Sequence, residues 1–146
     1  MNQLRLFRSY GLILAVLTLA VSGCQSPNAD APLTASGFPE EIVHAATADS
    51  VLAITRDFFT DRGYVERESR HAYEVVFDKP EGNPRRALRV RVRLYGQPDG
   101  SWRMVGAPMG VEDWRSDLES ERVLMQGAGQ IQGFLVDIKN RVEARR

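Results

Sequence analysis

The sequence predicts an α+β fold in which a three-stranded antiparallel sheet is covered on one face by two helices, in the order α-β-β-β-α. Apolar residues recur at helical spacing near the beginning and the end of the region 39–146, and they alternate with charged residues in its middle. Turn-forming Pro and Gly residues separate the alternating segments. A region of this length buries one core, so we expect 39–146 to be a single globular domain.

The first helix is expected over residues 39–62. Glu40 and Glu41 at its start complement the positive end of the helix dipole, and Gly63 directly follows the expected end. Apolar residues at spacings of three and four form one stripe, which consists of Val51, Ile54 and Phe58. The stripe is the surface that we expect this helix to bury.

Three strands are predicted over 73–77, 88–94 and 102–105, because apolar residues occupy every second position in each of them. The connections at 79–84 and 97–100 contain Pro and Gly, which favour turns. Short connections of this kind join antiparallel neighbours, and the alternation predicts a sheet with one buried face.

The last helix is expected over 112–145, where apolar residues recur at helical spacing and acidic residues precede basic ones. Its weak point is a group of three glycines: Gly127, Gly129 and Gly133. Either the helix breaks near Gly127, or the glycines allow it to lie close against the sheet. The Gly129-x-x-x-Gly133 spacing also suits contact with a second helix, for example in a dimer.

The N-terminus combines basic residues, a short apolar segment and the only cysteine of the chain. Arg5 and Arg8 precede the apolar residues 12–21, and small residues then lead to Cys24. A secretory signal has an apolar core of about 7–15 residues, whereas a membrane-spanning helix needs about 20. The length therefore favours a cleaved signal, with an uncleaved anchor helix as the alternative.

The sequence Val21-Ser22-Gly23-Cys24 resembles the lipobox of bacterial lipoproteins. The resemblance implies that residues 1–23 are a signal peptide removed before Cys24, and that the Cys24 sulfur carries a diacylglyceryl lipid. Residues 24–38 are small, polar and Pro-containing, which predicts a flexible tether. Gln25 stands where Asp would retain such a protein at the inner membrane, so the resemblance implies an outer-membrane anchor facing the periplasm.

Composition excludes some classes of function. Residues 1–23 contain two of the 19 basic and none of the 19 acidic side chains, so the remaining chain has a net charge of −2. Near-neutrality argues against nucleic acid as a partner. No sequence motif for nucleophilic catalysis, for a metal or for a cofactor is present, and the lipid on Cys24 is the only non-protein group expected.

The second predicted strand carries a row of arginines. Arg89, Arg91 and Arg93 share one face, because residues two apart in a strand point to the same side, and Arg103 on the next strand extends the row. Guanidinium groups suit phosphates and carboxylates, so this face is a candidate site for an anionic lipid or glycan of the envelope. The alternative is a solvent face on which the arginines are balanced by acids such as Glu74.

The function predicted from these features is that of a lipid-anchored, non-enzymatic protein that acts by contact with another envelope protein. Lipid, tether and compact domain are the parts that such an envelope-assembly or adaptor module requires. Binding of an anionic ligand through the arginine face is the alternative. An enzyme whose site assembles from scattered residues is the third possibility.

Overall fold

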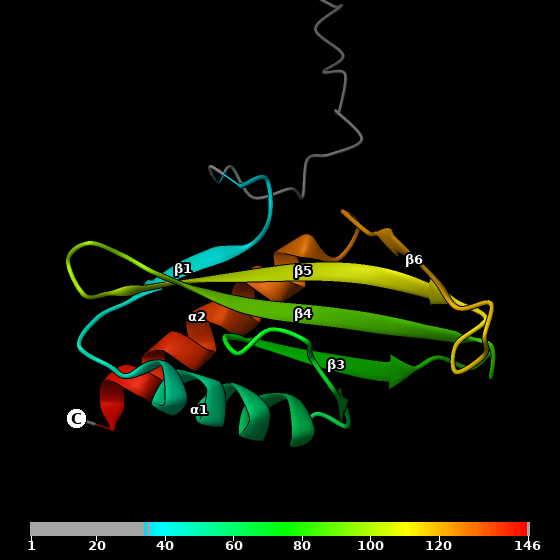
Figure 1. The fold of residues 1–146 in the computed structure, drawn as a ribbon, viewed down its shortest axis with the longest axis horizontal. Helices are drawn as coiled ribbons and strands as arrows, with labels where there is room; N and C mark the ends of the chain where they lie inside the picture. The colour runs from blue at the N-terminus through cyan, green and yellow to red at the C-terminus, as the bar shows by residue number, and fades with distance from the viewer. Residues whose placement is uncertain (1–33, 35, 146) are drawn as a thin grey trace, which may run out of the picture.

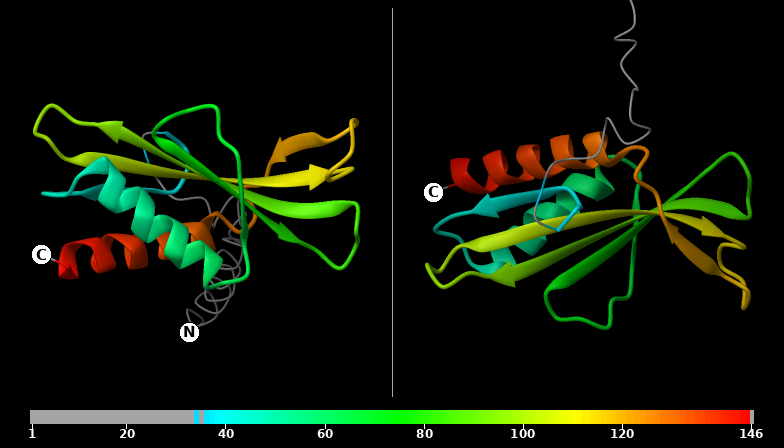
Figure 2. Two further views of the ribbon diagram at one scale, coloured as in Figure 1. Left: turned by 60° about the horizontal axis from the view of Figure 1, so that its bottom comes forward. Right: turned by 90° about the horizontal axis from the view of Figure 1, so that it is seen from above.

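The computed structural model describes Thr34 and residues 36–145. These residues form an α+β structure with one six-stranded antiparallel sheet and two helices, which pack on the same face of the sheet (Figures 1 and 2). In chain order the elements are β1 (Glu40–Val43), α1 (Ala48–Thr60), β2 (Val65–Arg67), β3 (Glu74–Pro80), β4 (Arg86–Gly96), β5 (Trp102–Glu112), β6 (Ser120–Val123) and α2 (Ala128–Ala144). Within the described residues, neither helix is long and apolar enough to span a bilayer.

Strand β5 organises the sheet, because it pairs along its whole length with β4 and shares its other edge between β1 and β6. Pro108 lies at the junction of the two short strands. Its carbonyl accepts a 3.0 Å hydrogen bond from the backbone N–H of Leu124, while the N–H of Gly106 donates to Pro39 at 2.8 Å. A proline has no N–H to donate, so it fits the point on the edge where neither neighbour offers an acceptor.

The core lies between the two helices and the inner face of the sheet. Phe58 and Phe59 of α1 are fully buried, and the Phe59 ring stacks on Phe77 of β3 with 4.7 Å between ring centroids. Helix α2 crosses β5 at Gly106, where a Cβ atom would lie 2.7 Å from Cγ2 of Ile131. The absence of a side chain at Gly106 therefore sets how closely α2 approaches the sheet.

The prediction of one helix over 39–62 is wrong at its start. Residues 40–43 form β1, and α1 begins only at Ala48, where the Thr47 hydroxyl accepts a 3.2 Å hydrogen bond from the Ser50 N–H as an N-cap. The stripe of Val51, Ile54 and Phe58 is nevertheless buried. A four-residue strand has too few positions for a period to show, and its pairing with β5 decides its conformation.

The prediction of a three-stranded sheet is also wrong, because β1, β2 and β6 add to the three strands expected. Strand β6 forms where the last helix was expected to begin, and α2 starts only after Gly127, which adopts φ 91° as its N-cap. The break near Gly127 is therefore the alternative that holds. Gly129 and Gly133 are exposed, so close approach to the sheet does not depend on them.

We expect Gly106→Ala to lower the free energy of unfolding by about 1–3 kcal/mol, because the added methyl group would force Ile131 and helix α2 outward. Gly133→Ala, on the exposed side of helix α2, is the matched control. Its Cβ would meet nothing within 4 Å, and alanine favours a helix over glycine by up to about 1 kcal/mol. Urea unfolding followed by circular dichroism measures both; equal effects would contradict the role of Gly106.

Candidate functional site

The face of the sheet that the helices leave uncovered, here called the outer face, carries a network of ion pairs. Antiparallel register places Asp78 of β3 opposite Arg89 of β4, and Glu74 opposite Arg93. Residues directly opposite in such a pair share a face, so the register itself brings acid and base together. The side chains of the network are those of Glu40, Arg67, Glu74, Asp78, Arg89, Arg91, Arg93, Arg103, Glu119 and Glu121.

The pair at the centre is buried. Arg89 Nε donates to Asp78 Oδ1 at 2.6 Å and Arg89 Nη2 donates to Oδ2 at 2.8 Å, while the two side chains are 4% and 1% exposed. The indole Nε1 of Trp114 also donates to Asp78 Oδ2, at 2.7 Å. The remaining guanidinium nitrogen, Nη1, contacts Glu119 at 2.9 Å and hydrogen-bonds to Glu121. The charges are thus withdrawn from water together with their partners.

These contacts shift the pKa values of the groups involved. Burial alone would raise the pKa of the Asp78 carboxyl, but hydrogen bonds from Arg89 and Trp114 outweigh burial and hold that pKa below its usual value. The pKa of the Glu119 carboxyl is also lowered. Burial opposes this shift, and hydrogen bonds from the Arg115 backbone and from Arg89 produce it. The hydrogen bond to Asp78 raises the pKa of Arg89. All three groups are therefore charged at neutral pH.

The cover over this pair is the segment 113–119 between β5 and β6, here called the β5–β6 loop. Asp113 and Arg115 adopt left-handed φ values of 50° and 62°, which are uncommon for residues other than glycine. The Arg115 backbone N–H donates to Glu119 Oε2 at 2.9 Å, and the Arg115 guanidinium lies 4.2 Å from the centre of the Trp114 ring. The loop is held in one shape over the outer face by these contacts.

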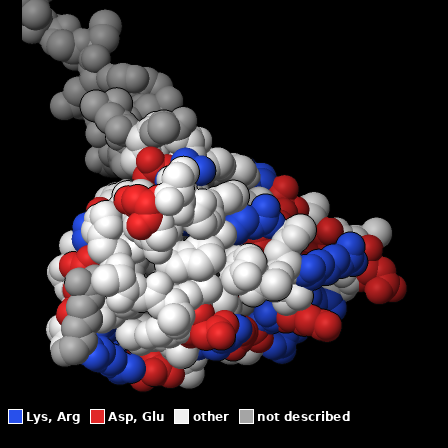
Figure 3. All heavy atoms as spheres, turned by 60° about the vertical axis from the view of Figure 1, so that its left-hand side comes forward, with Lys and Arg blue, Asp and Glu red and all other residues white. Residues whose placement is uncertain are grey.

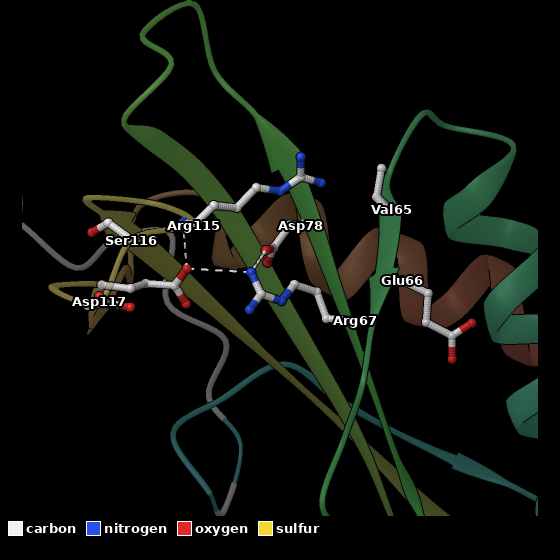
Figure 4. Close-up of a pocket in the computed structure, with 8 residues that line it drawn as sticks. Val65, Glu66, Arg67, Asp78, Arg115, Ser116 and Asp117 are labelled. Atoms are coloured by element: carbon white, nitrogen blue, oxygen red, sulfur yellow. Dashed lines mark hydrogen bonds and ion pairs between the residues drawn. The ribbon is translucent and has the colours of Figure 1, made fainter.

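A groove of about 530 Å³ lies between the β5–β6 loop and β2 (Figure 4). Arg67 reaches into it, and its Nη1 atom lies 3.3 Å from Asp78 Oδ2 and 3.4 Å from Glu119 Oε2. The lining consists of Val65, Glu66, Arg67, Asp78, Arg115, Ser116, Asp117 and Glu119. Four of the lining side chains are acids and two are arginines, so the lining is net negative and does not favour an anion.

The structure places the predicted arginines on the outer face, each beside an acid. Arg91 lies 2.8 Å from Glu121, and Arg93 lies 2.7 Å from Glu74, the acid named as its balance. Arg103 lies 3.5 Å from Glu40. Arg89 is the buried member described above, so the four guanidinium groups all have acidic neighbours before any ligand arrives.

Sequence reasoning named Glu74 but missed three other acids that hold this network: Asp78, Glu119 and Glu121. Asp78 continues the alternation of Glu74 and Val76 on the outer side of β3, so extending that strand by one residue would have found it. Glu119 and Glu121 gave no such signal, because their segment was expected to be helical. The prediction that Cys24 is lipidated, the signal at 1–23 and most of the tether fall outside the described residues.

Comparisons with known proteins assign no family to this arrangement. No family model matches the chain, and neither a curated protein nor a solved structure matches it. Among the described residues, no group of three or more His, Cys, Asp or Glu side chains is placed to hold a metal ion.

We expect Arg89→Gln to destabilise the fold by about 3–5 kcal/mol, because Asp78, Glu119 and Glu121 would lose the cation they share. Asp78→Asn should cost less, about 1–3 kcal/mol, since Arg89 keeps its two glutamates. Urea unfolding at neutral pH measures both changes. The reverse order of the two variants would contradict a network centred on Arg89.

Acid should weaken the folded state through Asp78 and Glu119. Both carboxyls have lowered pKa values when folded, so their stabilisation is complete above the ordinary pKa of about 4 and is lost as pH falls below it. Unfolding free energies measured from about pH 6 to about pH 3 should fall steeply in the wild type and less steeply in Asp78→Asn. Parallel curves would exclude Asp78 as a source of the dependence.

Proposed function

We propose that the protein is a bacterial envelope lipoprotein, anchored through Cys24, whose folded region acts non-enzymatically by contact with another envelope protein. The proposal joins the lipobox resemblance to one structural observation. That observation is the internal neutralisation of the outer face, where five arginines lie within 4.0 Å of five acids of the same chain.

Neutralisation weighs against the anionic-ligand alternative. A phosphate or carboxylate at Arg91 or Arg93 would have to displace Glu121 or Glu74, which already accept hydrogen bonds of 2.8–2.9 Å from these guanidinium groups. Exchanging one anionic partner for another gains little free energy. The incoming anion must lose its water, and the existing contact between arginine and glutamate is lost. The outer face therefore suits a structural role for its arginines better than ligand capture.

A fixed loop with an apolar tip supports the proposed contact. Leu118 is 78% exposed, although the loop that carries it is held by Trp114 on one side and by Glu119 on the other. An apolar side chain on an ordered support can enter a partner's pocket without a large loss of conformational entropy. Val65, also exposed, lines the groove beside the loop. We place the partner contact at the β5–β6 loop and this groove.

The test is photo-cross-linking in the native envelope, with a photoreactive amino acid at position 118. We expect one defined protein adduct at that position and none at position 136, a half-exposed apolar site on α2 that serves as the matched control. Leu118→Asp should abolish co-purification of the adduct partner while leaving the unfolding curve unchanged. Adducts with lipid alone, or equal adducts at both positions, would refute the proposed contact.

The anionic-ligand alternative has its own test. The double variant Arg91→Gln and Arg93→Gln should bind vesicles containing anionic lipid as well as the wild type does, because these arginines are committed to Glu121 and Glu74. Co-sedimentation with vesicles measures this binding. Both proteins carry Cys24→Ala, so that no lipid anchor contributes. A clear loss in the double variant would favour the alternative.

A further inference from the structure

The end of the sheet farthest from the β5–β6 loop is aromatic. Tyr73, Tyr95 and Trp102, here called the aromatic end, lie at or beside the hairpin that joins β4 to β5. Tyr73 is 51% and Tyr95 39% exposed, and the rings of Tyr73 and Trp102 are 5.4 Å apart between centroids. The hairpin and the β5–β6 loop occupy opposite ends of the long axis of the described structure (Figure 1). The aromatic end and the β5–β6 loop therefore point in opposite directions.

The aromatic residues lie on both faces of the hairpin. Trp102 pairs with Gly96, and its ring covers that glycine, where a Cβ would lie 3.5 Å from the indole. Tyr95 projects from the outer face, where the Arg103 guanidinium lies 5.0 Å from its ring centre. A ligand that contacts only one face of the sheet would not contact all three aromatic side chains. A surface that meets the tip of the hairpin end-on would contact them all.

The surface around the aromatic end is mixed: Arg103 and Asp99 are charged groups of this end, and they lie beside an uncharged area. Figure 3, which brings this end forward, shows a broad uncharged area with acidic and basic residues around it. Asp99 in the hairpin turn remains charged, because the Ser101 hydroxyl and backbone N–H donate to its Oδ1 at 2.6 and 2.9 Å and lower its pKa. Tyr and Trp combine an apolar ring with a polar tip, and such side chains concentrate where lipid meets water.

The predicted tether joins the described fold one short strand away from the aromatic end. Strand β1 begins at Glu40 and runs toward the hairpin, so that Val43 pairs with Trp102. Three residue steps of a strand cover about 10 Å. The predicted tether, residues 24–38, has a reach of roughly 20 Å as a flexible chain. The aromatic end therefore lies within reach of the bilayer that would hold the lipid on Cys24.

We propose that Tyr73, Tyr95 and Trp102 dock on the lipid–water interface of the anchoring membrane. The inference rests on the lipid anchor of the proposed function and adds an orientation to it. With the aromatic end on the bilayer, the β5–β6 loop and its groove point away from the membrane, where the proposed partner could reach them. Docking also limits the rotation that a flexible tether alone would permit.

The test uses the full lipoprotein reconstituted into vesicles of zwitterionic lipid brominated near the head group, and it reads tryptophan fluorescence. The chain has two tryptophans, and Trp114 lies at the opposite end over Asp78. We expect the lipid to quench the Trp102 share of the emission and to leave the Trp114 share. Trp102→Phe should abolish the quenching while the protein stays vesicle-bound, and Tyr95→Ser, an exposed substitution, should reduce it without changing the unfolding curve.

Each other outcome overturns the inference in a distinguishable way. Vesicle-bound protein without quenching would mean an anchored but undocked domain, which leaves the proposed function intact. Quenching that persists in Trp102→Phe would place the opposite end on the membrane. Quenching that appears only when envelope protein is added would mean that the aromatic end does not dock on lipid by its own chemistry. Protein that fails to associate with vesicles would remove the anchor and with it both proposals.

Discussion

The buried ion pair between Asp78 and Arg89 constrains most of the outer half of this fold. Moving two charges out of water is costly, and the attraction between them compensates only when their remaining hydrogen-bonding groups are satisfied. Here β3 and β4 supply the pair, while Trp114 and Glu119 from the β5–β6 loop and Glu121 from β6 complete it. The loop and the last strand are thus held where the buried charge requires partners. The left-handed residues of the loop are tolerated because these contacts determine its path.

The helix-covered side obeys a different constraint, which is close packing. Helix α2 lies against β5 at Gly106 and also protects the free edge of β1: the Gln132 side chain accepts from the Glu40 N–H and donates to the Glu40 carbonyl, both at 3.0 Å. An exposed strand edge invites pairing with other chains, and a side-chain amide that occupies it prevents this. Lys139, about two helical turns after Gln132, adds an ion pair to Glu41. One helix therefore both completes the core and covers the β1 edge of the sheet.

The aromatic end and the groove beside the β5–β6 loop lie at opposite ends of the fold. The outer face uses its charges internally, and the inner face is covered by helices, so neither broad surface of the sheet is open for binding. The aromatic end and, opposite it, the groove beside the β5–β6 loop remain accessible. A tethered protein with one end suited to lipid and the other to a partner would span the space between them. This geometry joins the two proposals into one account of how the domain is placed and used.

The sequence by itself determined the α+β class, the buried stripe of α1 and the shared face of Arg89, Arg91 and Arg93, because these follow from periodicities within single elements. It also carries the lipobox, which is a local motif. Only tertiary structure decided β1, β2 and β6, since strands of three or four residues show no period and form by pairing with residues distant in the chain. For the same reason, Glu119 and Glu121 could not be assigned as partners of the arginine row before the β5–β6 loop and β6 were placed beside it.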